Sequence, residues 1–505
     1  MTGTSPISRI AAASGASGAK DGSSAPDLPA IKEAVLTTLP PPEEAAQSTD
    51  QPLKPPEATA DRRLSVSLAE QPTQQQPVQL IKEKNGQWAL APDSRLVNNL
   101  SWVVGFMELA NAGDFAANIW NDIPVPVYAV VFMAIGGTVA GFLSIFAFRD
   151  ARRAWNNVRY LRKQRRLLLE EKSSCESRST STLELDVILA INFRELGTEL
   201  VTRWIMALLM GFGAILISIG TYMAIGGANQ AVFFASNLLS GYVGNAPIAL
   251  FGLVNSSWAA FIFCKAHGHV VASRTCLGSC TAAALVKRRA RKVQVFCVIN
   301  GTATVLGGVA SMVTATRWWG YVVLIPVIIA SIFCNIWWRK MMGYTRSEGH
   351  PAMARADLVH ALQFAAAAEF SNLDDPEAVP PWCSEMPATL GDTLDFLAQH
   401  SLFHQYCLEA VANTDIRQAL GGNLTDAIDL TISPHDIFVL PSALHPTLMG
   451  IAKKVVRDVR PSHFRNRERY LSELLGTYCT MARQHGIDDD AGSTGSHEEV
   501  GTEKI

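Results

Sequence analysis

Long uncharged runs dominate the middle of the chain. Between Arg203 and Lys265 there is no Asp, Glu, Lys, Arg or His. A helix needs about 20 consecutive apolar residues to cross a bilayer, where every backbone group must bond internally. The pattern predicts an all-α fold, a polytopic helical membrane protein with five transmembrane helices. The five runs lie at about 123–148, 204–225, 246–264, 293–316 and 318–338.

A sixth apolar segment, "SWVVGFMELANAGDFAANIW" at 101–120, contains Glu108 and Asp114. Each acidic side chain at mid-depth disfavours insertion by about 2.5–3.5 kcal/mol. We therefore favour five spans, with 101–120 as an amphipathic or re-entrant helix whose acidic residues face water. In the alternative, the segment is a sixth span. Asn99, in the sequon "NLS", is a glycosylation acceptor if the N-terminal tail is lumenal.

Basic residues predict the orientation. The stretches "FRDARRAWNNVRYLRKQRR", "ALVKRRARK" and "RKMMGYTR" follow the first, third and fifth runs, whereas residues 226–245 carry no charge. Cytosolic loops are enriched in Lys and Arg. Loops 149–202 and 265–292 and the C-terminus should therefore be cytosolic, with 149–202 forming a helical hairpin. The organelle stays open between plasma membrane and endomembranes.

The flanking regions differ in composition. Residues 1–80 are rich in Ser, Ala, Pro and Gln, which predicts disorder. The segments are a disordered tail (1–80), an amphipathic or re-entrant segment (81–122), the helical bundle (123–343), a helical cytosolic domain (344–486) and an acidic disordered tail (487–505).

Charge and motifs exclude several classes of function. The net charge is -2, so nothing indicates a nucleic-acid partner. Nine irregularly spaced cysteines do not suggest a disulfide framework. Phosphate-binding loops, dinucleotide fingerprints and hydrolase motifs are absent from the sequence. We expect no cofactor.

The stretch "FCKAHGHVVASRTCLGSC" at 263–280 holds three cysteines and two histidines. Zinc needs about four such ligands, and His267, His269, Cys276 and Cys280 would supply them, although the spacing is not a usual zinc pattern. Palmitoylation of Cys276 or Cys280 is the other functional interpretation. The simplest alternative is a loop with incidental thiols.

Polar residues inside the apolar runs suggest a substrate path. Glu108, Asp114, Asn255 and Asn300 are its candidate residues. Alternatively, such groups form hydrogen bonds between helices.

Three stretches, "NDIPVPVYA", "AINFRELGTELV" and "AVFFASNLLSGYVGNAPIAL", resemble a family of fungal, ascomycete multi-pass integral membrane proteins. The resemblance covers about 95–345. It implies a fungal membrane and brings no catalytic or binding residues.

These observations favour a non-enzymatic protein that moves small molecules or organises partners at a membrane. Its partners would be the lipid bilayer, anionic lipid headgroups and cytosolic proteins. The alternative is a membrane enzyme that uses Glu108 and Asp114 or the Cys/His stretch.

Overall fold

The computed structural model describes residues 77–83, 86–91, 94–120, 124–347, 353–369, 386–421 and 429–486. The two tails predicted to be disordered, 1–80 and 487–505, lie outside these ranges except for residues 77–80. At 78–80 the prediction is wrong, because strand β1 begins at Val78.

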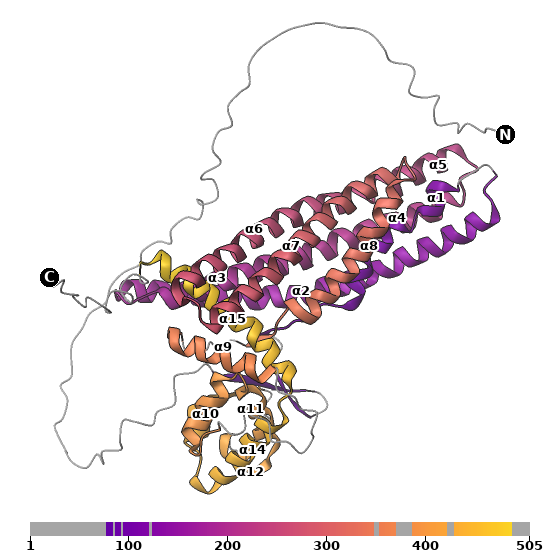
Figure 1. Cartoon of the computed structure of the whole chain (residues 1–505). Coiled ribbons are helices and arrows are strands. Elements are labelled where there is room, and N and C mark those ends of the chain that lie inside the picture. The colour runs from indigo at the N-terminus through magenta and orange to yellow at the C-terminus, as the bar shows by residue number, and fades with distance from the viewer. Residues whose placement is uncertain are drawn as a thin grey trace, which may run out of the picture. The chain divides into compact units, whose positions relative to one another are not determined.

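Five long helices lie side by side in the bundle (Figure 1). Each contains a stretch long and apolar enough to cross a membrane, which confirms the predicted spans. Large apolar side chains point outward: Leu253 is 63% exposed and Ile329 is 62% exposed. So much exposed apolar surface fits lipid rather than water. The helices are α2 (Val127–Ser177), α4 (Met206–Ala224), α6 (Ala246–Leu277), α7 (Thr281–Thr314) and α8 (Gly320–Trp337).

Three π-helical segments extend these helices. Such segments are rare and often occur at functional sites. Helix α3 (Leu183–Gly197) continues through η4 (Thr198–Ile205) into α4, α5 (Gln230–Asn237) continues through η5 (Leu238–Val243) toward α6, and α8 continues into η6 (Trp338–Met342).

Residues 149–202 form the predicted helical hairpin, made by α2 and α3. Residues 265–292, expected to be a loop, are instead mostly helical. Only a short turn at Gly278, with φ of 62°, separates α6 from α7. The Ala, Arg and Lys residues of "TAAALVKRRARK" are strong helix formers, which explains the extension.

The segment 101–120 forms a 3-10 helix, η3 (Trp102–Ala112), and a short helix, α1 (Phe115–Ile119). Near its start, Asn335 Nδ2 donates a hydrogen bond to the Ser101 carbonyl at 3.1 Å. Near its end, Asn118 Nδ2 donates to the Tyr321 hydroxyl at 2.8 Å. Because these partners lie at opposite ends of α8, the segment runs antiparallel to α8 along the bundle.

The expected wet face is therefore wrong, whereas a re-entrant path for the segment stays a prediction. Glu108 is 4% exposed and Asp114 is fully buried, so neither belongs to a wet face. Close packing explains the burial: a Cβ built on Gly105 would lie 2.8 Å from Asn335 Cβ. A 3-10 helix rises about 2.0 Å per residue, so η3 and α1 together cover roughly 30 Å, about one hydrocarbon thickness.

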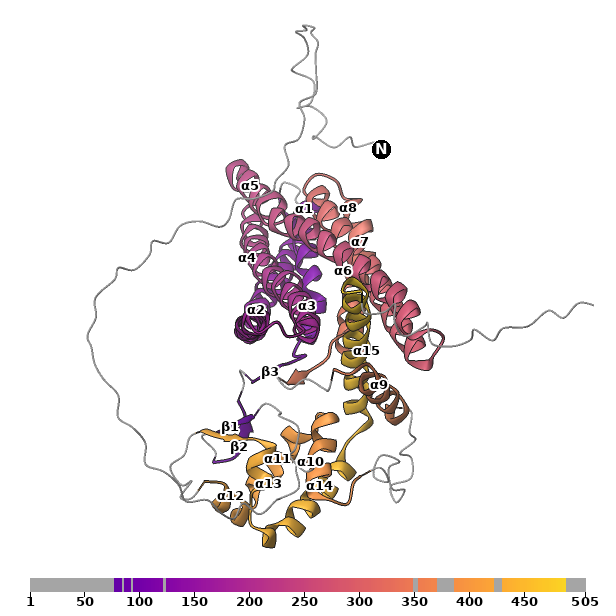
Figure 2. The same ribbon diagram turned by 90° about the vertical axis from the view of Figure 1, so that its left-hand side faces the viewer.

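Two small sheets tie the N-terminal flank to the C-terminal region. Strand β1 (Val78–Lys82) pairs antiparallel with both β2 (Trp88–Leu90) and β5 (Asp429–Ile432) (Figure 2). Strand β3 (Arg95–Leu96) pairs with β4 (Arg346–Ser347), directly after η6. We call the end of the bundle next to β3 and η6 the basic end, and the end next to Trp120 and Gly320 the far end.

The region predicted as a helical cytosolic domain is helical in its described parts. Its first core gathers around Leu394, Tyr406 and Leu448 and includes Leu80 of β1. Helix α15 leaves this core and packs against the extended ends of α3, α6 and α7. The elements are α9 (Arg355–Glu369), α10 (Leu390–Gln399), α11 (Phe403–Ala412), α12 (Thr414–Gly421), α13 (Pro434–Phe438), η8 (Ser442–Leu444), α14 (His445–Asp458) and α15 (Pro461–Gln484).

Candidate functional site

A cavity of about 90 Å³ lies inside the bundle, between η3 and helices α4, α6, α7 and α8. Its lining combines aromatic and aliphatic residues with a comparable number of polar ones. Small-molecule sites likewise combine apolar walls with polar groups that fix the orientation of the ligand. The polar lining includes Glu108, Asn255, Asn300 and Thr304, and so contains three of the four residues predicted for a substrate path.

Glu108 enters the cavity from η3. Its Oε2 accepts a hydrogen bond from Asn111 Nδ2 at 2.6 Å. Gly307 of α7 faces the carboxylate, and a Cβ built there would lie 3.7 Å from Oε2. The missing side chain at Gly307 leaves room for the carboxylate between two closely packed segments.

Asn255, fully buried on α6, is held in one orientation. Its Nδ2 donates to Thr304 Oγ1 at 3.1 Å, and Thr304 Oγ1 in turn donates to the Asn300 carbonyl at 3.0 Å. Because the hydroxyl proton is engaged, the hydroxyl oxygen must accept from the Asn255 amide nitrogen. The Oδ1 atom of Asn255 is buried and has no hydrogen-bond partner among the described residues.

A second cavity, of about 80 Å³, lies at the basic end. It shares Thr202, Phe296, Asn300 and Trp338 with the first, so the two adjoin. Thr202 belongs to η4 and Trp338 to η6, which places two π-helical segments at this junction.

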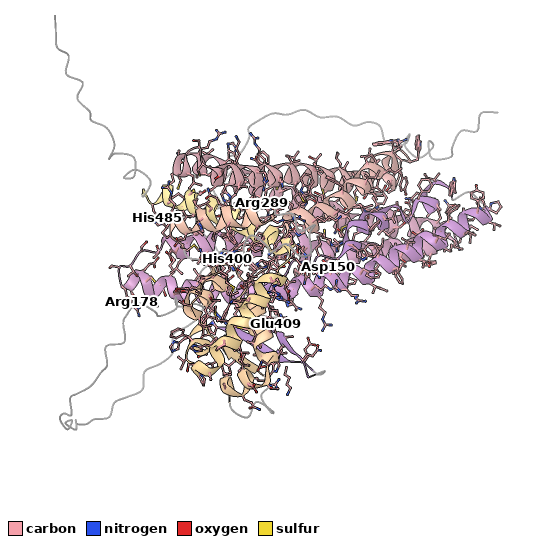
Figure 3. The ribbon with its side chains drawn as sticks, turned by 60° about the horizontal axis from the view of Figure 1, so that its bottom comes forward. Asp150, Arg178, Arg289, His400, Glu409 and His485 are labelled. Carbon is pink, nitrogen blue, oxygen red and sulfur yellow. The ribbon has the colours of Figure 1, made fainter. Side chains whose placement is uncertain are left out.

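Buried ion pairs lie beside both cavities, since Arg203 lines the first and Glu195 and Glu199 line the second. Arg203 lies 2.8 Å from Glu199 and 3.4 Å from Asp150, which Figure 3 labels on α2. Arg346 pairs with Glu195, which also accepts a hydrogen bond from the Tyr344 hydroxyl at 2.6 Å. Burial opposes the charge of Arg346, but Glu195 raises the pKa of Arg346 above its ordinary value.

Helix α15 closes the basic end with a further pair. Glu473 of α15 pairs with Arg194 of α3. Burial acts to raise the pKa of the Glu473 carboxyl, but Arg194, Arg289 and His269 together hold it below the usual value of 4.5. These three side chains and Lys265 meet Glu473 around a small third cavity. The third cavity shares Arg194 and Arg289 with the second.

The charged residues of the basic end were not among the predicted site residues. The sequence carries a signal for one pair, since Glu199 and Arg203 are four residues apart on one helical face. The partners on other helices, Asp150 and Glu473, are separated from them by long stretches of sequence.

Asp114, the fourth predicted residue, lies away from the cavities. It accepts a hydrogen bond from the Tyr321 hydroxyl at 2.9 Å and another from Asn118 Nδ2 at 3.0 Å. These bonds join α1 to the start of α8 at the far end. For Asp114, the alternative prediction of a hydrogen bond between helices therefore describes the contacts better than a substrate path does.

The Cys/His stretch does not form the predicted metal site. His267 is exposed and His269 is buried on the opposite side of α6, while Cys276 is buried and Cys280 half-buried. No three His, Cys, Asp or Glu side chains gather as a metal site requires anywhere in the described ranges. His269 instead packs against Gly476 of α15, where a Cβ would lie 3.1 Å from its ring.

The two modification sites stay predictions. Palmitoylation is not favoured at Cys276, which is 4% exposed. Cys280 follows Cys264 by 16 positions, most of them helical, which places it about 20 Å beyond the apolar run. Asn99 is half-buried between β3 and η3, next to the strand that pairs with β4.

Comparison with known proteins gives no match: no family model, curated protein or solved structure is similar to this chain.

Proposed function

We propose that the chain is a membrane transport protein whose solute path passes through the cavity beside Glu108. One observation carries the proposal: an internal cavity with a buried carboxylate adjoins a second, charged cavity at one end of the bundle. Ionisable side chains inside a membrane protein are costly to bury and commonly mark solute or ion pathways.

The proposal includes a sixth crossing by η3 and α1. If each of the five long helices crosses once, Val127 and Met342 lie on opposite faces of the membrane. Because β3 pairs with β4, residues 95–96 lie on the same face as Met342. The chain must then cross between 97 and 126. We place the basic end and the C-terminus in the cytosol, since the basic stretches lie at that end.

The assay is solute flux into proteoliposomes that contain the full-length protein. Glycerol, guanidinium and formate represent neutral, cationic and anionic solutes, and stopped-flow light scattering follows their entry. At least one should enter faster than into protein-free vesicles. Asn300→Phe fills the junction of the two cavities and should lower that rate roughly tenfold or more, since it removes free space where close packing leaves little.

Thr302→Phe is the matched control. Thr302 lies two residues from Asn300 on α7, is also polar and faces outward. Its replacement should leave flux unchanged. Equal rates with and without protein for all three solutes, or an Asn300→Phe variant as fast as wild type, would contradict the transport function.

The enzymatic alternative receives little support from this arrangement. The Cys/His stretch is dispersed, and Asp114 lies at the far end while Glu108 lines the cavity. A pair of carboxylates acting together needs a much closer approach.

Two kinds of partner, anionic lipid headgroups and cytosolic proteins, stay proposals. The basic stretch at 453–469 is a candidate surface for anionic headgroups, but several of its arginines are engaged within the protein. Arg465 pairs with Glu369 at 2.9 Å, and Arg469 donates to the Gly343 carbonyl at 3.0 Å. The outer face of α14 keeps exposed lysines for headgroups or cytosolic proteins.

A further inference from the structure

We infer that the cavity beside Glu108 binds a small protonated amine, an alkylammonium ion, as its solute. The inference rests on the proposed transport function and names the chemical class of the solute. It depends on three features of the cavity: the net charge of its lining, the orientation of its hydrogen-bond acceptors and the nature of its walls.

The charge of the lining favours a cation. Two ionisable side chains, Glu108 and Arg203, line the cavity. Arg203 is already paired with Glu199 and Asp150, so its charge is compensated. Glu108 receives a hydrogen bond from the neutral amide of Asn111. A buried carboxylate without a cation is costly, and a bound cation removes that cost.

The acceptors favour a cation that carries N–H groups. Asn255 donates its amide hydrogen to Thr304, which leaves the buried Oδ1 atom as an unsatisfied acceptor. Unsatisfied buried acceptors are uncommon and call for a donor. An ammonium group offers up to three donors, enough for Glu108 and Asn255 together.

The walls favour an organic cation over a bare metal ion. Phe251, Phe296, Trp338, Met206 and Met210 make up much of the lining. Hard metal cations are held by about six oxygen ligands, whereas this lining mixes its oxygen-bearing side chains with large aromatic and Met side chains. Aromatic faces attract organic cations, and the apolar walls accommodate an alkyl chain.

The experiment measures binding to the full-length protein in detergent, without transport. Ethylammonium chloride is titrated calorimetrically against sodium chloride, potassium chloride and 1-propanol, a neutral molecule of similar size. Ethylammonium should bind, and the other three should give no saturable signal. Glu108→Gln keeps the shape of the side chain and should weaken binding roughly tenfold or more, the effect of losing one charge-assisted hydrogen bond. Glu184→Gln, on the exposed face of α3, should bind as wild type does.

The outcomes separate this inference from transport itself. Binding of sodium or potassium in place of ethylammonium, equal binding of 1-propanol, or undiminished binding by Glu108→Gln would each overturn the amine as ligand. Ethylammonium binding that depends on Glu108, combined with no flux of ethylammonium or of the three other solutes into vesicles, would uphold the site and overturn the transport function. A second variant, Asn255→Asp, adds a carboxylate and should strengthen ethylammonium binding; weaker binding would contradict the inference.

Discussion

At the basic end of the bundle, buried ion pairs join the helices beside the two cavities, whereas at the far end the uncharged helices meet through small residues. Arg203 and Arg346 hold several elements together at the basic end. At the far end, backbones touch: a Cβ on Gly220 would lie 2.7 Å from Ser240 N. Cavities thus occur where charged side chains separate the helices, which is where a solute path can form.

The contrast between the two ends of the bundle also matches the composition of the segments around them. Ionic groups at the basic end lie beside the charged extensions of α2, α6 and α7 and beside α15. At the far end, the uncharged stretch 226–245 covers the bundle, and small residues allow the close helix contacts that are common in lipid. The comparison predicts different consequences for substitutions at the two ends.

The largest expected effect is the loss of an ion pair at the basic end. Arg346→Met leaves Glu195 buried without its cation, and removing one member of a buried pair costs about 3–5 kcal/mol. Thermal unfolding of the full chain in detergent measures this loss of stability. The double variant Arg346→Met, Glu195→Leu should recover much of the loss, because no unpaired charge remains.

Lys454→Met is the control for this prediction, since Lys454 forms an exposed pair with Glu409. It should unfold at the wild-type temperature. If Arg346→Met also unfolded at the wild-type temperature, the buried ion pairs would not be what stabilises the basic end.

A smaller effect is expected from Gly220→Ala at the far end. The added methyl group would lie 2.6 Å from Ser240 Cβ, so α4 and η5 must move apart. Overpacking of this kind costs about 1–3 kcal/mol. Gly268→Ala is the matched control, because a Cβ there meets nothing within 4 Å. If both variants had the same unfolding temperature, the close packing of the far end would not matter for stability.

The ion pair between α15 and α3 should make the stability of the protein depend on pH. The folded-state pKa of Glu473 lies below the ordinary 4.5, so its stabilising effect is complete above about pH 4.5 and is lost as pH falls below that value. At pH 7, Glu473→Gln should cost about 1–3 kcal/mol, as for a hydrogen bond to a charged group. The difference from wild type should shrink progressively below pH 4.5. A difference that stays constant down to pH 3 would contradict the pairing with Arg194.

Much of this architecture follows from sequence because lipid imposes a simple rule. Helices such as α8 face lipid on one side and therefore exclude charge over their whole apolar run, which hydropathy detects. The segment η3 follows another rule. One face of it packs against protein, so the buried Glu108 and Asp114 are tolerated, and its close contact with Asn335 depends on a glycine. Counting charges therefore predicted a wet face at 101–120 that the segment does not have.

The candidate site was predictable only in part, for a similar reason. Glu108, Asn255 and Asn300 stand out as polar residues in apolar runs, and all three line one cavity. The sequence spacing of Glu108 and Asp114 does not show that Asp114 lies outside the cavity. The reason is that η3 is a 3-10 helix and ends before α1 begins. The pairing of β1 with β5 joins residues about 350 positions apart, a relation that no local pattern contains.

The last prediction concerns the two faces of the membrane and involves no change in stability. Ala228 is exposed near the far end and Gln79 is exposed on β1. Replacing each by Cys therefore gives one thiol to label at either end. In a plasma-membrane orientation with six crossings, an impermeant thiol reagent should label Ala228→Cys in intact cells and Gln79→Cys only after permeabilisation, with wild type giving the background. Asn99 should carry no glycan, since it lies on the side of Gln79. Labelling of Gln79→Cys in intact cells, or a glycan on Asn99, would restore five spans, because the chain before α2 would then lie outside and η3 would not cross. Such a result would also contradict the solute path, since Glu108 reaches the cavity only if η3 occupies the centre of the bundle.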